Sequence, residues 1–180
     1  MFIDITPNPN AKRFVLDKIL LENEIYLEIS TDSQVDKKLP VLLIELSKLS
    51  FISRLFVMNN FITIIKKSDA IWDIIVPCIQ DVIFKHIDSF CLNQEVVYDY
   101  KNDIEERIIN VLSKYVGPAI AMDGGAIRYH SFEKSNGVLT VEVLGACQGC
   151  PSLYNTLRIG IEPMVKDLVP QVKSVVQLKK

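Results

Sequence analysis

The chain has 180 residues, of which 49% are hydrophobic and 23% are charged, values that exclude a disordered or collagen-like protein. This length permits one large or two small domains. The longest charge-free stretch, residues 143–157, contains polar side chains and is shorter than the about 20 apolar residues of a spanning helix, so we expect no membrane segment. A net charge of −2 without a basic run predicts no nucleic-acid partner.

Glycine divides the sequence into two parts, because all seven glycines lie between residues 117 and 160. We therefore predict a first domain at residues 1–90, a linker at 91–101 and a second domain at 102–180.

The first domain begins with extended segments on either side of Thr6–Asn10, where two prolines indicate a turn. Pro40 begins a predicted helix that runs to about Leu49. The apolar runs 54–58 and 61–65 are separated by two asparagines and predict a β-hairpin.

A second helix is predicted after Ser68, which is a candidate N-cap, and Pro77 predicts a kink in it. Apolar residues recur there at three- and four-residue steps, and we assign them to the core. They are Ile71, Ile74, Ile75, Cys78, Ile79, Val82 and Ile83. These elements predict a small α+β domain.

The second domain is predicted to have the order helix, strand, strand, helix, strand, which is again α+β. The elements are a helix from Asn102 to a stop or kink at Gly117-Pro118, strands at 126–132 and 138–144, a helix from Pro151 to about Leu168, and a strand at 173–178. Its two cysteines lie between the second strand and the second helix.

Cys147 and Cys150 form a CxxC pair whose thiols can face one metal centre. Free N–H groups and the positive end of the following helix favour thiolate over thiol, and Gly145 and Gly149 let the backbone approach a bulky inorganic ligand. Zinc and iron–sulfur clusters take four ligands. A symmetric homodimer supplies four thiolates from two chains.

CxxC also occurs in thiol–disulfide oxidoreductases and in zinc sites, and both a redox enzyme and a structural zinc-bridged dimer stay open as alternatives. The other cysteines do not add to the pair. Cys78 follows an apolar helix pattern and is predicted to be a buried core residue, and Cys91 has no ligand-like neighbour. His86 and His130 are assigned ordinary surface or core roles.

Several motifs follow one another in an order that is far more specific than CxxC alone. They are Thr6-Pro7-Asn8-Pro9-Asn10-Ala11 with Phe14, Asp123-Gly124-Gly125, Leu144-Gly145-Ala146-Cys147-Gln148-Gly149-Cys150-Pro151-Ser152, Thr156-Leu157 and Gly160-Ile161-Glu162. Together they resemble the NifU-like iron–sulfur scaffold and carrier proteins called Nfu, in their two-domain form. Asp123-Gly124-Gly125 either orients the thiolate loop from outside or forms a turn that needs positive φ, and we favour the turn because it explains both glycines.

The resemblance implies that Cys147 and Cys150 of two chains bridge one labile 4Fe-4S cluster, which passes to apo-proteins. It implies an iron-binding scaffold or carrier, supplied by an upstream assembly scaffold, that is not an enzyme. We expect the first domain to serve partner recognition or regulation. No leader pattern is visible at the N-terminus, so we expect a bacterial cytoplasm, with a processed mitochondrial matrix protein as the alternative.

Overall fold

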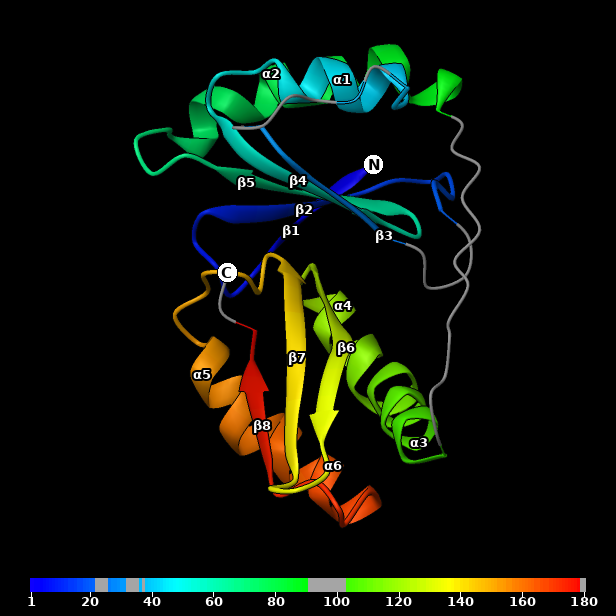
Figure 1. The fold of residues 1–180 in the computed structure, drawn as a ribbon. Helices are drawn as coiled ribbons and strands as arrows, with labels where there is room; N and C mark the ends of the chain where they lie inside the picture. Colours follow the sequence, from blue (N-terminus) through cyan, green and yellow to red (C-terminus); the bar gives the residue numbers. More distant parts are fainter. Residues whose placement is uncertain (22–25, 32–35, 37, 91–102, 179–180) are drawn as a thin grey trace. The chain divides into compact units, whose positions relative to one another are not determined.

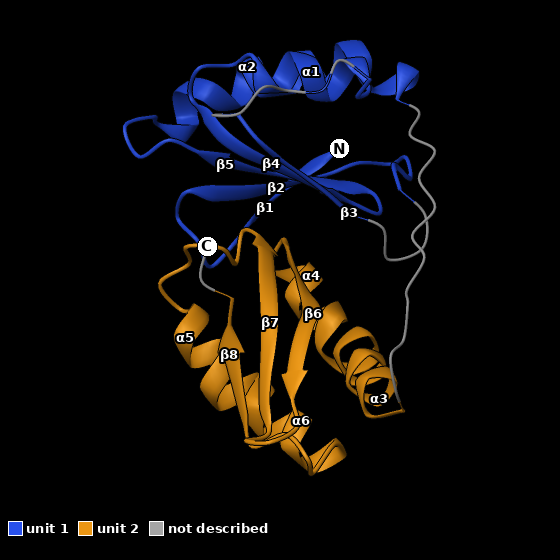
Figure 2. Cartoon of the chain, in the orientation of Figure 1, with its two compact units in different colours: residues 1–96 blue, residues 97–180 orange. Residues whose placement is uncertain are grey.

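The computed structural model describes residues 1–21, 26–31, 36, 38–90 and 103–178. The chain forms two compact units, residues 1–96 and 97–180, which Figure 2 shows in different colours. The predicted linker at 91–101 lies outside the described residues. No helix within the described part is long and apolar enough to cross a membrane.

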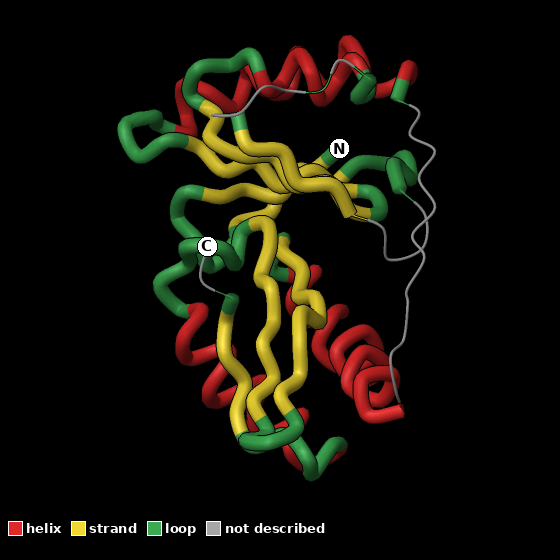
Figure 3. Tube along the Cα trace, in the orientation of Figure 1, coloured by secondary structure: helices red, strands yellow, loops and turns green. Residues whose placement is uncertain are grey.

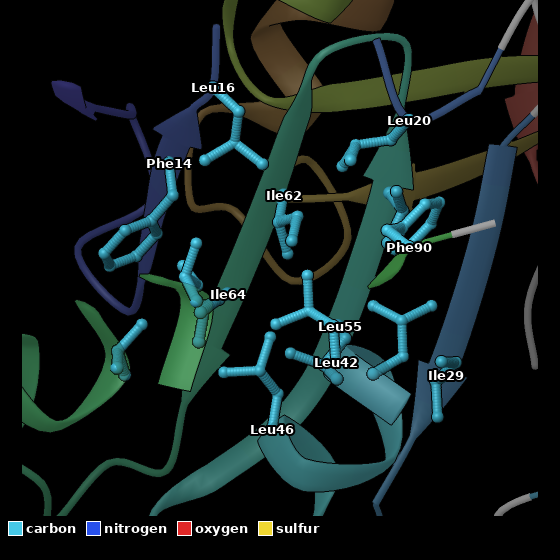
Figure 4. Close-up of a cluster of buried hydrophobic side chains, with 14 of the residues drawn as sticks. Phe14, Leu16, Leu20, Ile29, Leu42, Leu46, Leu55, Ile62, Ile64 and Phe90 are labelled. Carbon is cyan, nitrogen blue, oxygen red and sulfur yellow. The ribbon is translucent and has the colours of Figure 1, made fainter. Parts of the chain in front are cut away.

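The first unit is a five-stranded antiparallel sheet with two helices on one face (Figure 1). Its elements are β1 (Phe2–Ile5), β2 (Ala11–Val15), β3 (Tyr26–Ser30), α1 (Val41–Ser47), β4 (Ile52–Met58), β5 (Phe61–Lys66) and α2 (Trp72–His86). The strand order is β1-β2-β5-β4-β3. Leucine and isoleucine side chains from the sheet and both helices form one buried cluster, part of which Figure 4 shows. The α+β class is thus confirmed for this unit.

The predicted hairpin at β4 and β5 is confirmed: Met58 pairs with Phe61, and Asn59 takes a positive φ of 47° in the turn. Strand β3 was not predicted, because its polar residues obscure the alternation of apolar and polar side chains that is typical of a strand. It pairs with β4 and forms an edge of the sheet.

Two predictions for α2 are wrong. Its N-cap is Ile71 and not Ser68. Cys78 is exposed, and so are Ile71 and Ile74, whereas the buried residues of the helix are Ile75, Ile79 and Ile83. The apolar pattern contains two overlapping stripes, and the helix turns only one of them toward the core of this unit. Pro77 lies inside the helix.

The second unit packs its helical segments against a three-stranded sheet of order β6-β7-β8, as Figure 3 shows. Its elements are α3 (Asp103–Val111), a π-helical turn (Leu112–Val116), α4 (Gly117–Met122), β6 (Gly125–Glu133), β7 (Val138–Gly145), α5 (Leu153–Asn155), a second π-helical turn (Thr156–Ile161), α6 (Glu162–Leu168) and β8 (Ser174–Gln177). Strands β6 and β7 are antiparallel, and β7 and β8 are parallel.

The helix boundaries of this unit differ from the prediction in two places. Of the stop or kink predicted at Gly117-Pro118, the stop does not occur: the helical segment changes from a π-helical turn to α4 at Gly117 and continues to Met122. The preceding π-helical turn, in which Gly117 N–H donates to Leu112 O, carries the chain past a proline that has no N–H for an ordinary helical bond. The second helical segment begins at Leu153, so Pro151 lies in the turn before it.

Glu162 connects the helical segment after the cysteines to β8. Its carboxylate accepts hydrogen bonds from Arg158 Nη1 at 2.7 Å, Lys166 Nζ at 2.7 Å and the Val175 N–H at 2.9 Å. Burial alone would raise the pKa of this carboxyl, but the Lys166 hydrogen bond, the Val175 N–H and the two positive charges lower it overall. The bonds of this one carboxylate therefore help to hold α6 against β8.

We predict that Glu162→Gln lowers the free energy of unfolding at pH 7 by about 2 kcal/mol, the size of one or two charge-assisted hydrogen bonds. Because the folded-state pKa is lowered, this stabilisation exists above the unfolded pKa and is lost as the pH falls through the folded one. The difference between the two chains should therefore shrink at pH 3. Urea denaturation at both pH values measures it. The control is Glu45→Gln, which removes an exposed carboxylate paired with Lys48 and should change little. Equal stability of the Gln variant and the original chain at pH 7 would contradict this role.

Candidate functional site

The two cysteines lie in the loop between the end of β7 and the start of α5, as expected from the sequence. Figure 1 shows this loop connecting the two elements. The loop consists of successive turns: Gln148 N–H donates to Gly145 O at 3.1 Å, and Cys150 N–H donates to Cys147 O at 3.2 Å. Gly145 and Gly149 take positive φ values of 64° and 78°. A side chain at either position would be strained, so the glycines set the course of the loop.

The two thiols lie in different environments. Cys147 is 8% exposed and belongs to the hydrophobic cluster of this unit, whereas Cys150 is half-buried. Burial, followed by the charges of Asp123 and Cys150, raises the pKa of the Cys147 thiol to about 12. The expectation that the following helix favours a thiolate is therefore wrong for Cys147. Desolvation is the larger effect, and α5 has only three residues before the π-helical turn.

Gly125 makes the buried position of Cys147 possible. A Cβ at Gly125 would stand 2.7 Å from Cys147 Sγ and 2.7 Å from Leu144 O, distances that only a bare Cα allows. Gly124 has a positive φ of 78°, and its carbonyl accepts the Ala146 N–H at 3.1 Å. The turn explanation therefore holds for Gly124, but Gly125 is glycine because the sulfur lies against it.

The sequence analysis ranked a turn above a role beside the thiolate loop, and so did not predict the contact of Gly125 with Cys147 or the effect of the Asp123 charge on that thiol. Both residues belong to the Asp123-Gly124-Gly125 motif, about 20 positions before the cysteines in the chain. The motif itself could be recognised in the sequence, but the sequence did not reveal that it lies against Cys147. The antiparallel register, in which Gly125 pairs with Gly145, brings the two segments together.

No cluster of three or more histidine, cysteine or acidic side chains occurs within the described ranges. Cys78 lies on α2 of the other unit, and Cys91 lies outside the described residues. His86 ends α2, and His130 lies on β6. The described part of one chain therefore brings together two thiols, half of the four ligands that a tetrahedral zinc or a cubane cluster takes.

The donor set of the loop suits a soft metal or an iron–sulfur cluster, since thiolates are the ligands that such centres select. Gly149 faces open space, because a Cβ there would meet no atom within 4 Å. The backbone beside Cys150 is therefore accessible to a bulky inorganic group.

Two family models match this chain. One, described as NifU-like domain, matches residues 108–176, and the other, described as Scaffold protein Nfu/NifU N terminal, matches residues 2–90. The chain belongs to the two-domain NifU-like (Nfu) family. The resemblance seen in the sequence motifs is thereby confirmed.

The Nfu relatives align with almost the whole chain. NifU-like protein 5, mitochondrial, of Arabidopsis thaliana is 28% identical over 98% of this chain and 68% of its own length. NFU1 iron-sulfur cluster scaffold homolog, mitochondrial, of Homo sapiens is 27% identical over 99% of this chain and 72% of its own length. NifU-like protein, mitochondrial, of Saccharomyces cerevisiae is 29% identical, with coverages of 96% and 78%.

Solved structures match a smaller part. The crystal structure of protein SAV1430 from Staphylococcus aureus is 25% identical, covers 46% of this chain and 95% of that chain, and superposes with a TM-score of 0.42.

We predict that Gly125→Ala lowers the free energy of unfolding by about 1–3 kcal/mol, since the new methyl group overpacks the site. The substitution should also displace Cys147 and make its thiol more accessible. The control is Gly160→Ala, because a Cβ there meets no atom within 4 Å, and a helical Gly→Ala change is neutral or stabilising by up to about 1 kcal/mol. Chemical denaturation of both variants measures the difference. Equal stability of the two would contradict the close packing at Gly125.

We predict that the two site thiols of the metal-free chain react with iodoacetamide at different rates. Cys150 should be alkylated about tenfold or more faster than Cys147, because the thiolate is the nucleophile and Cys147 is buried with a raised pKa. Exposed Cys78 is the internal control for a freely accessible thiol. Peptide mass spectrometry over a time course gives each rate. Equal rates at Cys147 and Cys150 would contradict the asymmetry.

Proposed function

We propose that this Nfu protein is a scaffold and carrier that holds an iron–sulfur cluster as cargo through Cys147 and Cys150. The observation that carries the proposal is the placement of both thiols on one glycine-shaped loop, beside open space at Gly149. The name of the human relative, an iron-sulfur cluster scaffold homolog, supports the same role.

We further propose that the cargo is a 4Fe-4S cluster shared between two chains. A cubane is typically held by four cysteines, and one loop supplies two. A twofold dimer completes the set with the same two residues from a second copy, and closed twofold dimers are the most common oligomers. The homodimer is therefore proposed for the cluster-bound state.

Delivery to apo-proteins follows from the exposure of the loop. Cys150 is half-buried, so the thiolate of an acceptor can approach the iron that it holds. In such an exchange one iron–thiolate bond forms and another breaks, without any change of oxidation state. The proposed partners are apo iron–sulfur proteins as acceptors and an upstream assembly scaffold as donor.

The proposal assigns no catalytic turnover to the pair. A redox enzyme and a structural zinc-bridged dimer are the competing functions. For the location, the mitochondrial relatives support the matrix, which was the alternative expectation, over a bacterial cytoplasm.

We predict that the full chain, reconstituted anaerobically with iron and sulfide, binds about two irons and two sulfides per chain as a coloured dimer. Cys147→Ala and Cys150→Ala should each abolish cluster binding, because a dimer of either variant keeps only two of the four required thiolates. The matched control is Cys78→Ala, which removes an exposed cysteine of the other unit and should leave iron content unchanged.

The same preparations discriminate the competing functions. A colourless dimer with stoichiometric zinc would identify the structural alternative. Rapid reduction of a model disulfide by the metal-free monomer would identify an oxidoreductase. Retention of the cluster by Cys147→Ala would contradict the proposed ligand set.

A further inference from the structure

A hollow of about 470 Å³ lies beside Cys150, between β8 and the helical segment that follows the cysteine loop. In Figure 1 these two elements run next to each other in the second unit. The walls are mainly apolar and are formed by Cys150, Pro151, Leu153, Leu157 and Val175. The volume falls within the about 300–1,000 Å³ of ordinary binding clefts. The hollow can therefore receive a large side chain.

Tyr154 stands at the rim of this hollow and is 70% exposed. A single exposed apolar side chain needs no explanation by itself. Tyr154, however, is four residues from Cys150 and borders an apolar hollow that Cys150 also lines. Tyrosine presents a large ring with a polar tip, and it is enriched in the cores of protein interfaces. The chain thus carries a projection and a hollow side by side.

The proposed function decides what meets this surface, and the inference rests on it. If one cluster is bound by two chains, the two Cys150 side chains are separated by little more than the cluster itself. The walls beside each Cys150 must then face the other chain. In a twofold contact the same patch is used on both sides, so a projection next to a hollow can engage its counterpart twice.

We propose that Tyr154 of each chain enters the hollow beside Cys150 of a second copy, so that two such contacts hold the cluster-bearing loops together. The second copy is the occupant because the ligand count already requires its thiols at this place. A buried aromatic anchor surrounded by weaker contacts is the usual source of interface affinity. Tyr154 is thus a dimerisation residue that neither ligates the cluster nor belongs to the buried core.

The test uses the full chain, reconstituted anaerobically, with Tyr154→Ala. Sedimentation velocity over a dilution series gives the dissociation constant of the cluster-bound dimer. We expect Tyr154→Ala to weaken the dimer about tenfold or more, the effect of removing an interface anchor. The matched control is Ile159→Ala, because Ile159 is similarly exposed, at 74%, on the same helical segment and does not line the hollow. Its dimer should dissociate like that of the original chain.

A second variant approaches the contact from the other side. Gln177→Trp adds bulk at a half-buried residue that lines the hollow, and it should weaken the dimer as well. Thermal unfolding of the metal-free chains shows whether each variant folds. If Tyr154→Ala does not fold, the dissociation constant of Gln177→Trp tests the contact instead. An unchanged dissociation constant for a folded Tyr154→Ala would overturn the proposal. Slower transfer to an apo-acceptor with an unchanged dimer would overturn it too, and would assign the hollow to the acceptor.

The iron content separates this inference from the proposed function. If the original chain binds no cluster, or Cys147→Ala retains one, the proposed function fails and the dimer contact falls with it. If the original chain loads about two irons per chain and Tyr154→Ala dimerises normally, only the contact is wrong. At protein concentrations well above the dissociation constant, Tyr154→Ala should load as much iron as the original chain.

Discussion

Gly125 opens β6 with its bare Cα turned toward Cys147, and the sulfur occupies the place where any other residue would carry a Cβ. The neighbouring Gly124 carbonyl accepts the Ala146 N–H, so a hydrogen bond joins the start of β6 to the start of the cysteine loop. The burial of Cys147, and with it the difference between the two thiols, depends on this contact.

The contact gives Cys147 two roles that compete. As a side chain it is part of the hydrophobic cluster, and as the proposed ligand it must lose its proton and face a metal. Burial and the charge of Asp123 both oppose the thiolate. In the metal-free chain the thiol form of Cys147 is therefore favoured over the thiolate.

The elements that sequence patterns predicted well are those with local causes. The β4–β5 hairpin follows from two asparagines between apolar runs, and the β6–β7 hairpin follows from alternation on both sides of Glu133–Gly137. Other features depend on partners distant in the chain. The pattern of α2 fits two faces, and the core of the first unit, not the pattern, turns Ile75 inward and leaves Cys78 exposed. The burial of Cys147 likewise depends on a residue distant in the chain, because Gly125 belongs to another strand.

The hollow beside Cys150 depends on a second distant contact. Glu162 accepts the N–H of Val175, which lines the hollow, so the helical segment after the cysteines is held to β8 at this residue. The same carboxylate binds Arg158, which lines the hollow one turn after Tyr154. Because the helical segment and β8 are fixed to each other there, the space between them is a property of the folded unit and does not require a bound partner to form. Its nearness to Cys150 then follows from the shortness of the loop, in which Leu153 N–H already donates to Cys150 O at 3.1 Å. The same few turns of chain therefore position both the proposed thiol ligands and the hollow beside Cys150.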